Sequence, residues 1–107
     1  MSGLRQNNQT EIELRGDYNT IYDAIIKSAK TVGNVTQENR NMGFVSLKTP
    51  MKLFPPINSV NLKITIKKSN DENYTVKFDA DSLDGLAGMG SCGKIIDKFI
   101  QDLSSRI

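Results

Sequence analysis

The chain has 107 residues, the size of one small domain, and its 37% hydrophobic and 24% charged residues are typical of a globular protein. Fourteen lysines and arginines against twelve acidic residues leave a formal charge of +2, which is too small to indicate a nucleic-acid partner. Histidine is absent and Cys92 is the single cysteine, which excludes histidine-dependent catalytic triads, zinc sites with several His or Cys ligands, and internal disulfides.

The first predicted elements are a strand and a helix. Residues 10–15 alternate apolar and charged side chains, as in a half-buried strand. Residues 1–9 are polar, and we expect them to be flexible. Asp17 is a favourable N-cap, and apolar residues then recur at helical spacing up to Gly33, so a first helix is predicted over 18–32.

Four further strands and a second helix follow. Residues 35–38 and 44–49 flank a turn rich in Asn and Gly, which predicts a hairpin. The alternation of 60–67 and of 74–80 predicts a second and clearer hairpin. From Ser91 onward an apolar stripe at helical spacing predicts the last helix. The predicted order of elements is βαββββα.

This order predicts a single α+β domain over 1–107. We expect a two-layer sandwich, in which an antiparallel five-stranded sheet has both helices on one face and a face of lysines and threonines open to water. The order of elements resembles that of helix-grip and related small two-layer domains, and the resemblance covers most of the chain. Such folds carry many unrelated functions, so the resemblance implies no particular activity.

A rigid apolar loop is the most unusual segment of the sequence. Prolines at 50, 55 and 56 disfavour a helix or an interior strand over 50–57. Its apolar side chains either pack beneath the sheet or remain exposed as a contact surface. We predict the second, with Leu53 and Phe54 at least partly exposed in the monomer. The predicted ligand or partner contacts are Met51, Leu53, Phe54 and Ile57.

A second loop, 83–93, is rich in glycine. Its segment 88–94 has the spacing G-x-x-x-x-G-K of a phosphate-binding loop. Ile95 follows where such a loop needs Ser or Thr to hold magnesium, so we predict no nucleotide site. We interpret the loop as a connection whose glycines allow close backbone approach, with at most a weak anion site at Ser91, Gly93 and Lys94.

No metal or other cofactor is predicted. Asp79, Asp81 and Asp84 resemble part of a calcium loop, but the third acid and the closing glutamate of such a loop would fall on Leu83 and Gly90. Cys92 in a first helical turn near Lys94 has a setting that favours the thiolate, yet the chain offers no histidine as its base.

The leading hypothesis is a non-enzymatic binding module. It would take an apolar ligand or a protein segment near the 51–57 and 83–93 loops. One alternative is a structural or assembly subunit that acts through contacts between copies of the chain. A weaker alternative is an enzyme or metal-dependent protein that uses Asp79, Asp81, Cys92 and Lys94.

Partners and location follow from what the sequence lacks. The lysines of the open sheet face have no aromatic residues between them, so they do not form an RNA-binding platform. No apolar run is long enough for a signal peptide or a membrane span, and we therefore expect a cytoplasmic protein. A trimmed form of a secreted or lipid-anchored protein would show the same features.

Overall fold

The computed structural model describes residues 5–50, 52–53, 56–57, 59–83 and 91–107, with side chains described for 9–50, 59–81 and 93–107. Its elements in chain order are β1 (Arg5–Arg15), α1 (Tyr18–Val32), β2 (Asn34–Asn39), β3 (Phe44–Lys48), β4 (Lys52–Leu53), β5 (Pro56–Ile57), β6 (Asn61–Lys68), β7 (Asn73–Leu83) and α2 (Ser91–Ser104).

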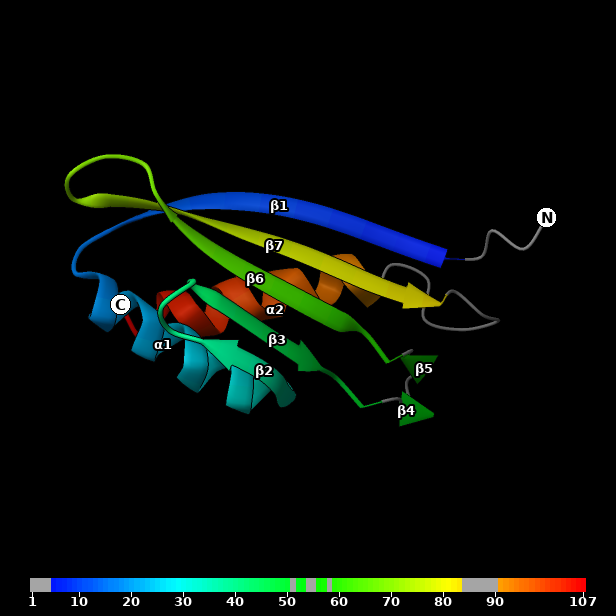
Figure 1. The fold of residues 1–107 in the computed structure, drawn as a ribbon. Helices are drawn as coiled ribbons and strands as arrows, with labels where there is room; N and C mark the ends of the chain where they lie inside the picture. The colour runs from blue at the N-terminus through cyan, green and yellow to red at the C-terminus, as the bar shows by residue number, and fades with distance from the viewer. Residues whose placement is uncertain (1–4, 51, 54–55, 58, 84–90) are drawn as a thin grey trace.

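Within the described residues, five strands form an antiparallel sheet in the order β1-β7-β6-β3-β2, and both helices cover one of its faces (Figure 1). The predicted α+β two-layer sandwich is thereby confirmed. Helix α1 packs on β2 and β3, α2 packs on β7 and β1, and the helices also contact each other. Each half of the sheet therefore has its own helix.

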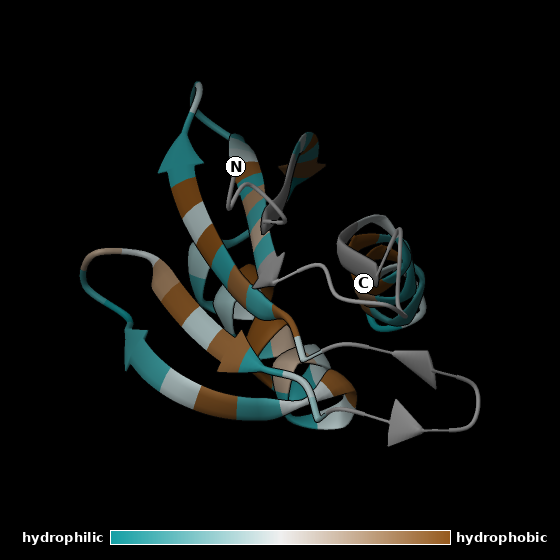
Figure 2. Cartoon of the chain, turned by 90° about the vertical axis from the view of Figure 1, so that its right-hand side faces the viewer, coloured by the Kyte–Doolittle hydropathy of each residue, from teal (hydrophilic) through white to brown (hydrophobic). Residues whose placement is uncertain are grey.

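Alternation along the strands decides which side chains enter the core. In β6, Leu62, Ile64 and Ile66 are buried, while Lys63 and Lys67, on the other face of the strand, are exposed. The same banding of apolar and polar residues is visible along the strands in Figure 2, where the sheet curves around the helices. Phe78 of β7 and Phe99 of α2 are fully buried with ring centroids 5.5 Å apart, as the apolar stripe of the last helix predicts.

Helix α1 has the predicted bounds. The side chain of Asp17 accepts a hydrogen bond from the Thr20 N–H at 3.2 Å, which caps the first turn. At the other end the backbone of Gly33 is extended rather than left-handed. Glycine is needed there because a Cβ atom would lie 2.7 Å from the Lys48 carbonyl oxygen. The helix thus ends where the chain passes closely against β3.

The chain forms more strand than the sequence predicts. Residues 5–9, which we expected to be flexible, extend β1, and they pair with residues 79–83 of β7. Their side chains do not alternate, but main-chain hydrogen bonds between strands require no apolar side chain. The segment 50–57, predicted as a loop, contains the short strands β4 and β5. Proline is tolerated in so short a ribbon because its strands are edges.

Candidate functional site

The two segments predicted to contact a ligand are anchored at one end of the molecule. Strands β4 and β5, the last residues of β7 and the first turn of α2 lie at the end opposite to the β6–β7 turn (Figure 1). Figure 2 looks onto this end. We call it the α2-start end, and its described boundary residues are Thr49, Val60, Leu83 and Ser91.

A hydrogen-bonded clamp holds the base of the 50–59 segment. The Thr49 N–H donates to the Val60 carbonyl at 2.9 Å, and the Val60 N–H donates to the Thr49 hydroxyl oxygen at 2.9 Å. The Ser59 hydroxyl donates to the Thr49 carbonyl at 2.7 Å. Thr49 and Val60 are both buried. The clamp continues the pairing of β3 with β6, so the segment beyond it projects from the end of the sheet.

Two of the four predicted contact residues fall within the residues that the structure describes. Leu53 belongs to β4 and Ile57 to β5, and the register sets Leu53 opposite Pro56. Met51 and Phe54 lie outside the described residues. At 52–53 and 56–57 the segment forms a short two-stranded ribbon, and the contact role of the four residues stays a prediction.

The predicted anion site lies at the start of α2. Ser91 is the first residue of the helix, Gly93 is half-buried and Lys94 is exposed to solvent. A helix start and one exposed lysine can attract an anion, but anion binding by these three residues stays a prediction.

The four residues of the enzyme or metal alternative do not converge. Asp79 and Asp81 alternate along β7 with buried Phe78 and Ala80, so they lie on the face of the sheet turned away from the helices. Cys92 and Lys94 belong to α2, on the other face. Asp79 instead accepts a hydrogen bond from Gln9 at 3.5 Å. Within the described part of the chain, no group of three His, Cys, Asp or Glu could hold a metal ion.

The opposite end of the sandwich is closed by an aromatic cluster. The Tyr18 ring lies 6.1 Å from that of Tyr22 and 5.6 Å from that of Tyr74, measured between centroids. The Arg40 guanidinium lies 4.6 Å from the Tyr22 centroid and forms an ion pair with Asp23, and the Tyr18 hydroxyl donates to the Arg40 carbonyl. Burial raises the pKa of both Tyr18 and Tyr22. We call this cluster the tyrosine end.

Sequence reasoning missed the tyrosine end. The spacing of Tyr18 and Tyr22 was visible as part of the apolar stripe of α1. Arg40 lies in the turn between β2 and β3, and no local pattern indicates that this turn reaches the first turns of α1. Its role here is structural, because it ties the hairpin to the helix.

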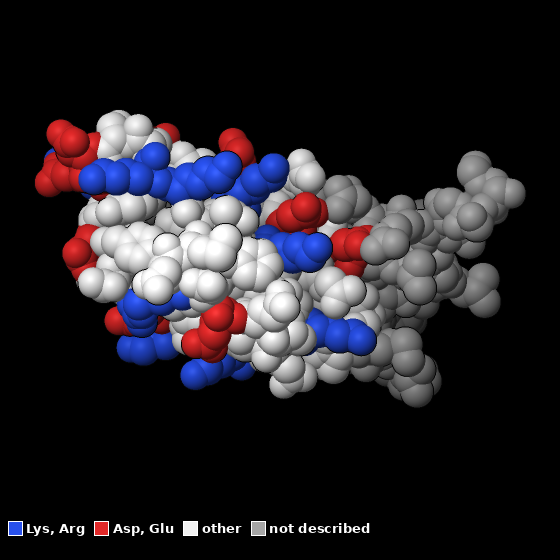
Figure 3. All heavy atoms as spheres, viewed as in Figure 1, with Lys and Arg blue, Asp and Glu red and all other residues white. Residues whose placement is uncertain are grey.

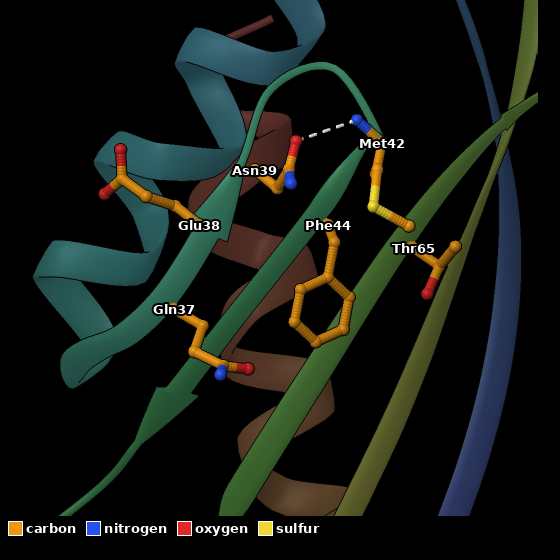
Figure 4. Close-up of a pocket in the computed structure, with 6 residues that line it drawn as sticks. All are labelled: Gln37, Glu38, Asn39, Met42, Phe44 and Thr65. Atoms are coloured by element: carbon orange, nitrogen blue, oxygen red, sulfur yellow. Dashed lines mark hydrogen bonds between the residues drawn. The ribbon is translucent and has the colours of Figure 1, made fainter.

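A hollow of about 520 Å³ lies on the outer face of the sheet, beside the β2–β3 turn (Figure 4). Met42, 74% exposed, and Phe44 lie next to each other there, and the Met42 N–H donates to the Asn39 side chain at 3.0 Å. In Figure 3 the outer surface here is a patch of uncharged atoms bordered by basic and acidic side chains. The hollow is lined by Gln37, Glu38, Asn39, Met42, Phe44 and Thr65.

The sequence matches no protein-family model and no curated protein. Solved structures do share the fold. The di-domain ARO/CYC (aromatase/cyclase) StfQ from the steffimycin biosynthetic pathway matches 92% of this chain with a TM-score of 0.70 at 5% identity, and this chain spans 44% of that protein. An Arabidopsis thaliana member of the major latex protein family matches with a TM-score of 0.66 at 10% identity, covering 97% of this chain and 92% of that chain.

A ginseng (Panax ginseng) major latex-like protein has a TM-score of 0.57 at 10% identity, over 97% of this chain and 95% of that chain. The structural neighbours are helix-grip proteins. At such identities the likeness shows the fold alone, and it agrees with the order of elements read from the sequence. No helix formed by the described residues is long and apolar enough to cross a membrane.

The expectation that this protein is not an enzyme is wrong as an inference from its residues. StfQ is named as an aromatase/cyclase and shares this fold. The expectation rested on the absence of histidine triads and of metal-ligand sets in the sequence. Missing them says little about a fold whose neighbours include enzymes.

Proposed function

We propose that this protein binds an apolar small molecule at the α2-start end. The observation that supports the proposal most directly is that the apolar 51–57 segment and the glycine-rich 83–93 segment, far apart in sequence, are anchored at the same end of a helix-grip sandwich. Apolar ligands bind in concave sites lined mostly by apolar side chains, and the sequence offers such side chains in the first segment.

Element lengths support the proposal in physical terms. Eleven residues of β1 or β7 span about 36 Å at about 3.3 Å per residue. Fifteen residues of α1 and fourteen of α2 span only about 21–23 Å at 1.5 Å per residue. Neither helix is long enough to cover the β1–β7 pair from end to end. The end of the β1–β7 pair near the α2-start end therefore extends beyond the length of one helix, and a ligand beneath the 51–57 segment would lie beside it.

The chemistry of the 51–57 segment favours a small apolar ligand. Prolines restrict its backbone before a ligand arrives, which lowers the cost of ordering it. Lys48 and Lys52 flank the apolar residues and would form a polar rim. On the sheet, the fully buried side chains of β7 change from Phe78 to the small Ala80 toward this end.

The test is a titration with 1-anilinonaphthalene-8-sulfonate, a fluorescent apolar probe. The Leu53→Ser/Phe54→Ser double variant is compared with Met42→Ser, which removes an exposed apolar side chain from the outer face. We expect saturable binding to the wild type, affinity about tenfold lower in the double variant and unchanged affinity in Met42→Ser. Denaturant unfolding should give free energies within about 1 kcal/mol for all three proteins.

Three results would contradict the proposal. One is wild-type protein that shows no saturable binding of the probe. Another is an equal loss of affinity in Met42→Ser. The third is an unfolded double variant, because Leu53 and Phe54 would then be part of the core rather than contacts for a ligand.

A further inference from the structure

The two edges of the sheet differ in their capacity to pair with another strand. Among the described strands, β2 and β1 are the edges. Strand β2 has six residues, and its register with β3 shifts between Val35 and Gln37. Strand β1 has eleven residues that pair with β7 in one unbroken register. Bulges, prolines and charged side chains protect edges from pairing. Strand β1 has no bulge and no proline, and its four charged residues are two arginines and two glutamates, which can pair with each other.

We propose that β1 is an interaction surface for a second copy of this chain. The two β1 strands pair antiparallel about a two-fold axis and join two five-stranded sheets into one. The pairing uses main-chain N–H and C=O groups on the side of β1 opposite to β7, so it leaves the fold of each copy unchanged.

Charges disfavour most registers of this pair. Full overlap, with the axis at Thr10, would set Arg5 of one copy against Arg15 of the other. An axis at Glu11 sets this glutamate against itself, and an axis at Ile12 sets Glu11 against Glu13. Like charges directly opposite each other destabilise a strand pair.

An axis at Gln9 removes these conflicts. Position 5 then lies opposite position 13, so Arg5 of each copy faces Glu13 of the other, and the overlap covers 5–13. An axis at Asn8 also avoids like charges but shortens the overlap to 5–11. The longest register with opposite charges paired is therefore the one centred on Gln9, and opposite charges across a strand pair stabilise it.

The proposed β1–β1 dimer is weak, and it does not grow into a larger assembly. Nine residues of edge contact bury less than the roughly 1,200 Å² typical of stable interfaces, so the dimer forms reversibly at high protein concentration. Each copy has one β1, and the bulge in β2 blunts the other edge. Association therefore stops at the dimer.

Sedimentation velocity between about 10 μM and about 1 mM, a range suited to a weak interface, tests the association. The wild type should shift from monomer to dimer and no further. Gln9→Lys should remain monomeric, because two lysines meet at the axis, while within one copy the new lysine faces Asp79 and the fold is kept. Gln37→Lys, a matched change on β2, should dimerise as the wild type does. A wild type that stays monomeric, or equal effects of the two variants, would overturn the proposal.

Cysteine cross-linking in a Cys92→Ala background tests the register. Residues directly opposite each other in an antiparallel pair have Cα atoms about 4.5–5.5 Å apart, which suits a disulfide. Gln9→Cys should therefore form a covalent dimer on oxidation much faster than Asn8→Cys, Glu13→Cys or Gln37→Cys. Equal rates in all four variants would indicate random collision, and fastest cross-linking through position 37 would indicate pairing through β2. Either result would contradict the inference.

Discussion

The two ends of this sandwich are built in different ways. At the tyrosine end, three aromatic rings, an arginine and an ion pair connect α1 to the β2–β3 turn and to β7. At the α2-start end, the described contacts at the base of the 50–59 segment are the hydrogen bonds of Thr49, Ser59 and Val60. The first end is held by side-chain packing between elements distant in sequence, and the described residues at the base of the 50–59 segment by hydrogen bonds that continue the pairing of β3 with β6.

This difference suggests a division of labour. Side-chain packing among buried groups contributes most of the stability of a small domain, whereas segments with few buried contacts open at low cost and are used for binding. The tyrosine end and the core next to it should therefore dominate the unfolding free energy. The α2-start end should tolerate substitution while controlling ligand binding. The following predictions test this comparison.

The largest effect is expected in the core between the ends. Phe99→Ala removes a fully buried ring that packs on Phe78, and it should lower the unfolding free energy by about 3–5 kcal/mol. Denaturant melts measure the change, with Ile107→Ala as a control because Ile107 is 52% exposed. A loss below about 1 kcal/mol would show that α2 does not contribute to the core as described.

Gly43→Ala tests the tyrosine end. The residue has φ of 68°, and a Cβ atom would lie 2.7 Å from the Ile66 carbonyl oxygen, so both backbone strain and a steric clash result. We expect a loss of about 2–4 kcal/mol with unchanged probe binding in the folded protein. Gly16→Ala is the control, since φ is 142° but no atom lies within 4 Å of the added group. Equal losses of unfolding free energy in the two variants would show that the close approach to the Ile66 carbonyl oxygen is not the cause.

Thr49→Val tests the clamp at the α2-start end. The hydroxyl oxygen that accepts the buried Val60 N–H is lost while the volume is kept, so the cost should be about 1–3 kcal/mol. Unlike Gly43→Ala, this variant should also lower the affinity of the protein for the apolar probe, because the clamp holds the 50–59 segment. Thr65→Val on the outer face serves as the control. Unchanged probe affinity would mean that the clamp stabilises the fold without positioning the site.

The smallest effect is expected for Asp102 of α2. Its partner Arg106 also contacts α1, so this group links the two helices. The Ser28 hydroxyl and the Arg106 guanidinium hold the pKa of Asp102 below its usual value of 3.8. Arg106 donates to Asp102 at 2.9 Å and to Thr31 of α1 at 2.9 Å. Because the folded pKa is lowered, the stabilisation is present above the unfolded pKa and is lost as the pH falls through the folded value.

Asp102→Asn should therefore lower the unfolding free energy by at most about 1 kcal/mol at pH 7. The difference from the wild type should shrink as the pH falls through the lowered pKa of Asp102, because the wild-type carboxyl then becomes protonated as well. Asp97→Asn, on the exposed face of α2, is the control. Urea melts across the pH range measure both variants, and a difference that persists unchanged in acid would assign the effect to packing rather than to charge.

The elements with strong periodicity were predictable. The bounds of α1 and the hairpin of β6 and β7 follow from apolar residues at helical and strand spacing, because each element must bury one face. The polar half of β1 was not predictable, since residues 5–9 are ordered by main-chain pairing with β7 rather than by their own pattern. The expectation that the chain is not an enzyme failed for a related reason: it judged residue types without the fold that gives them context.

The sequence alone determined the two-layer architecture and the direction in which each strand faces, because alternation and helical spacing are local properties. It also marked the 51–57 and 83–93 segments as unusual. Only the tertiary structure decided that these segments are anchored at one end, that Asp79 and Asp81 lie across the sheet from Cys92 and Lys94, and that Arg40 reaches Tyr22. Such proximities depend on strand order and register, which arise from contacts between residues far apart in the chain.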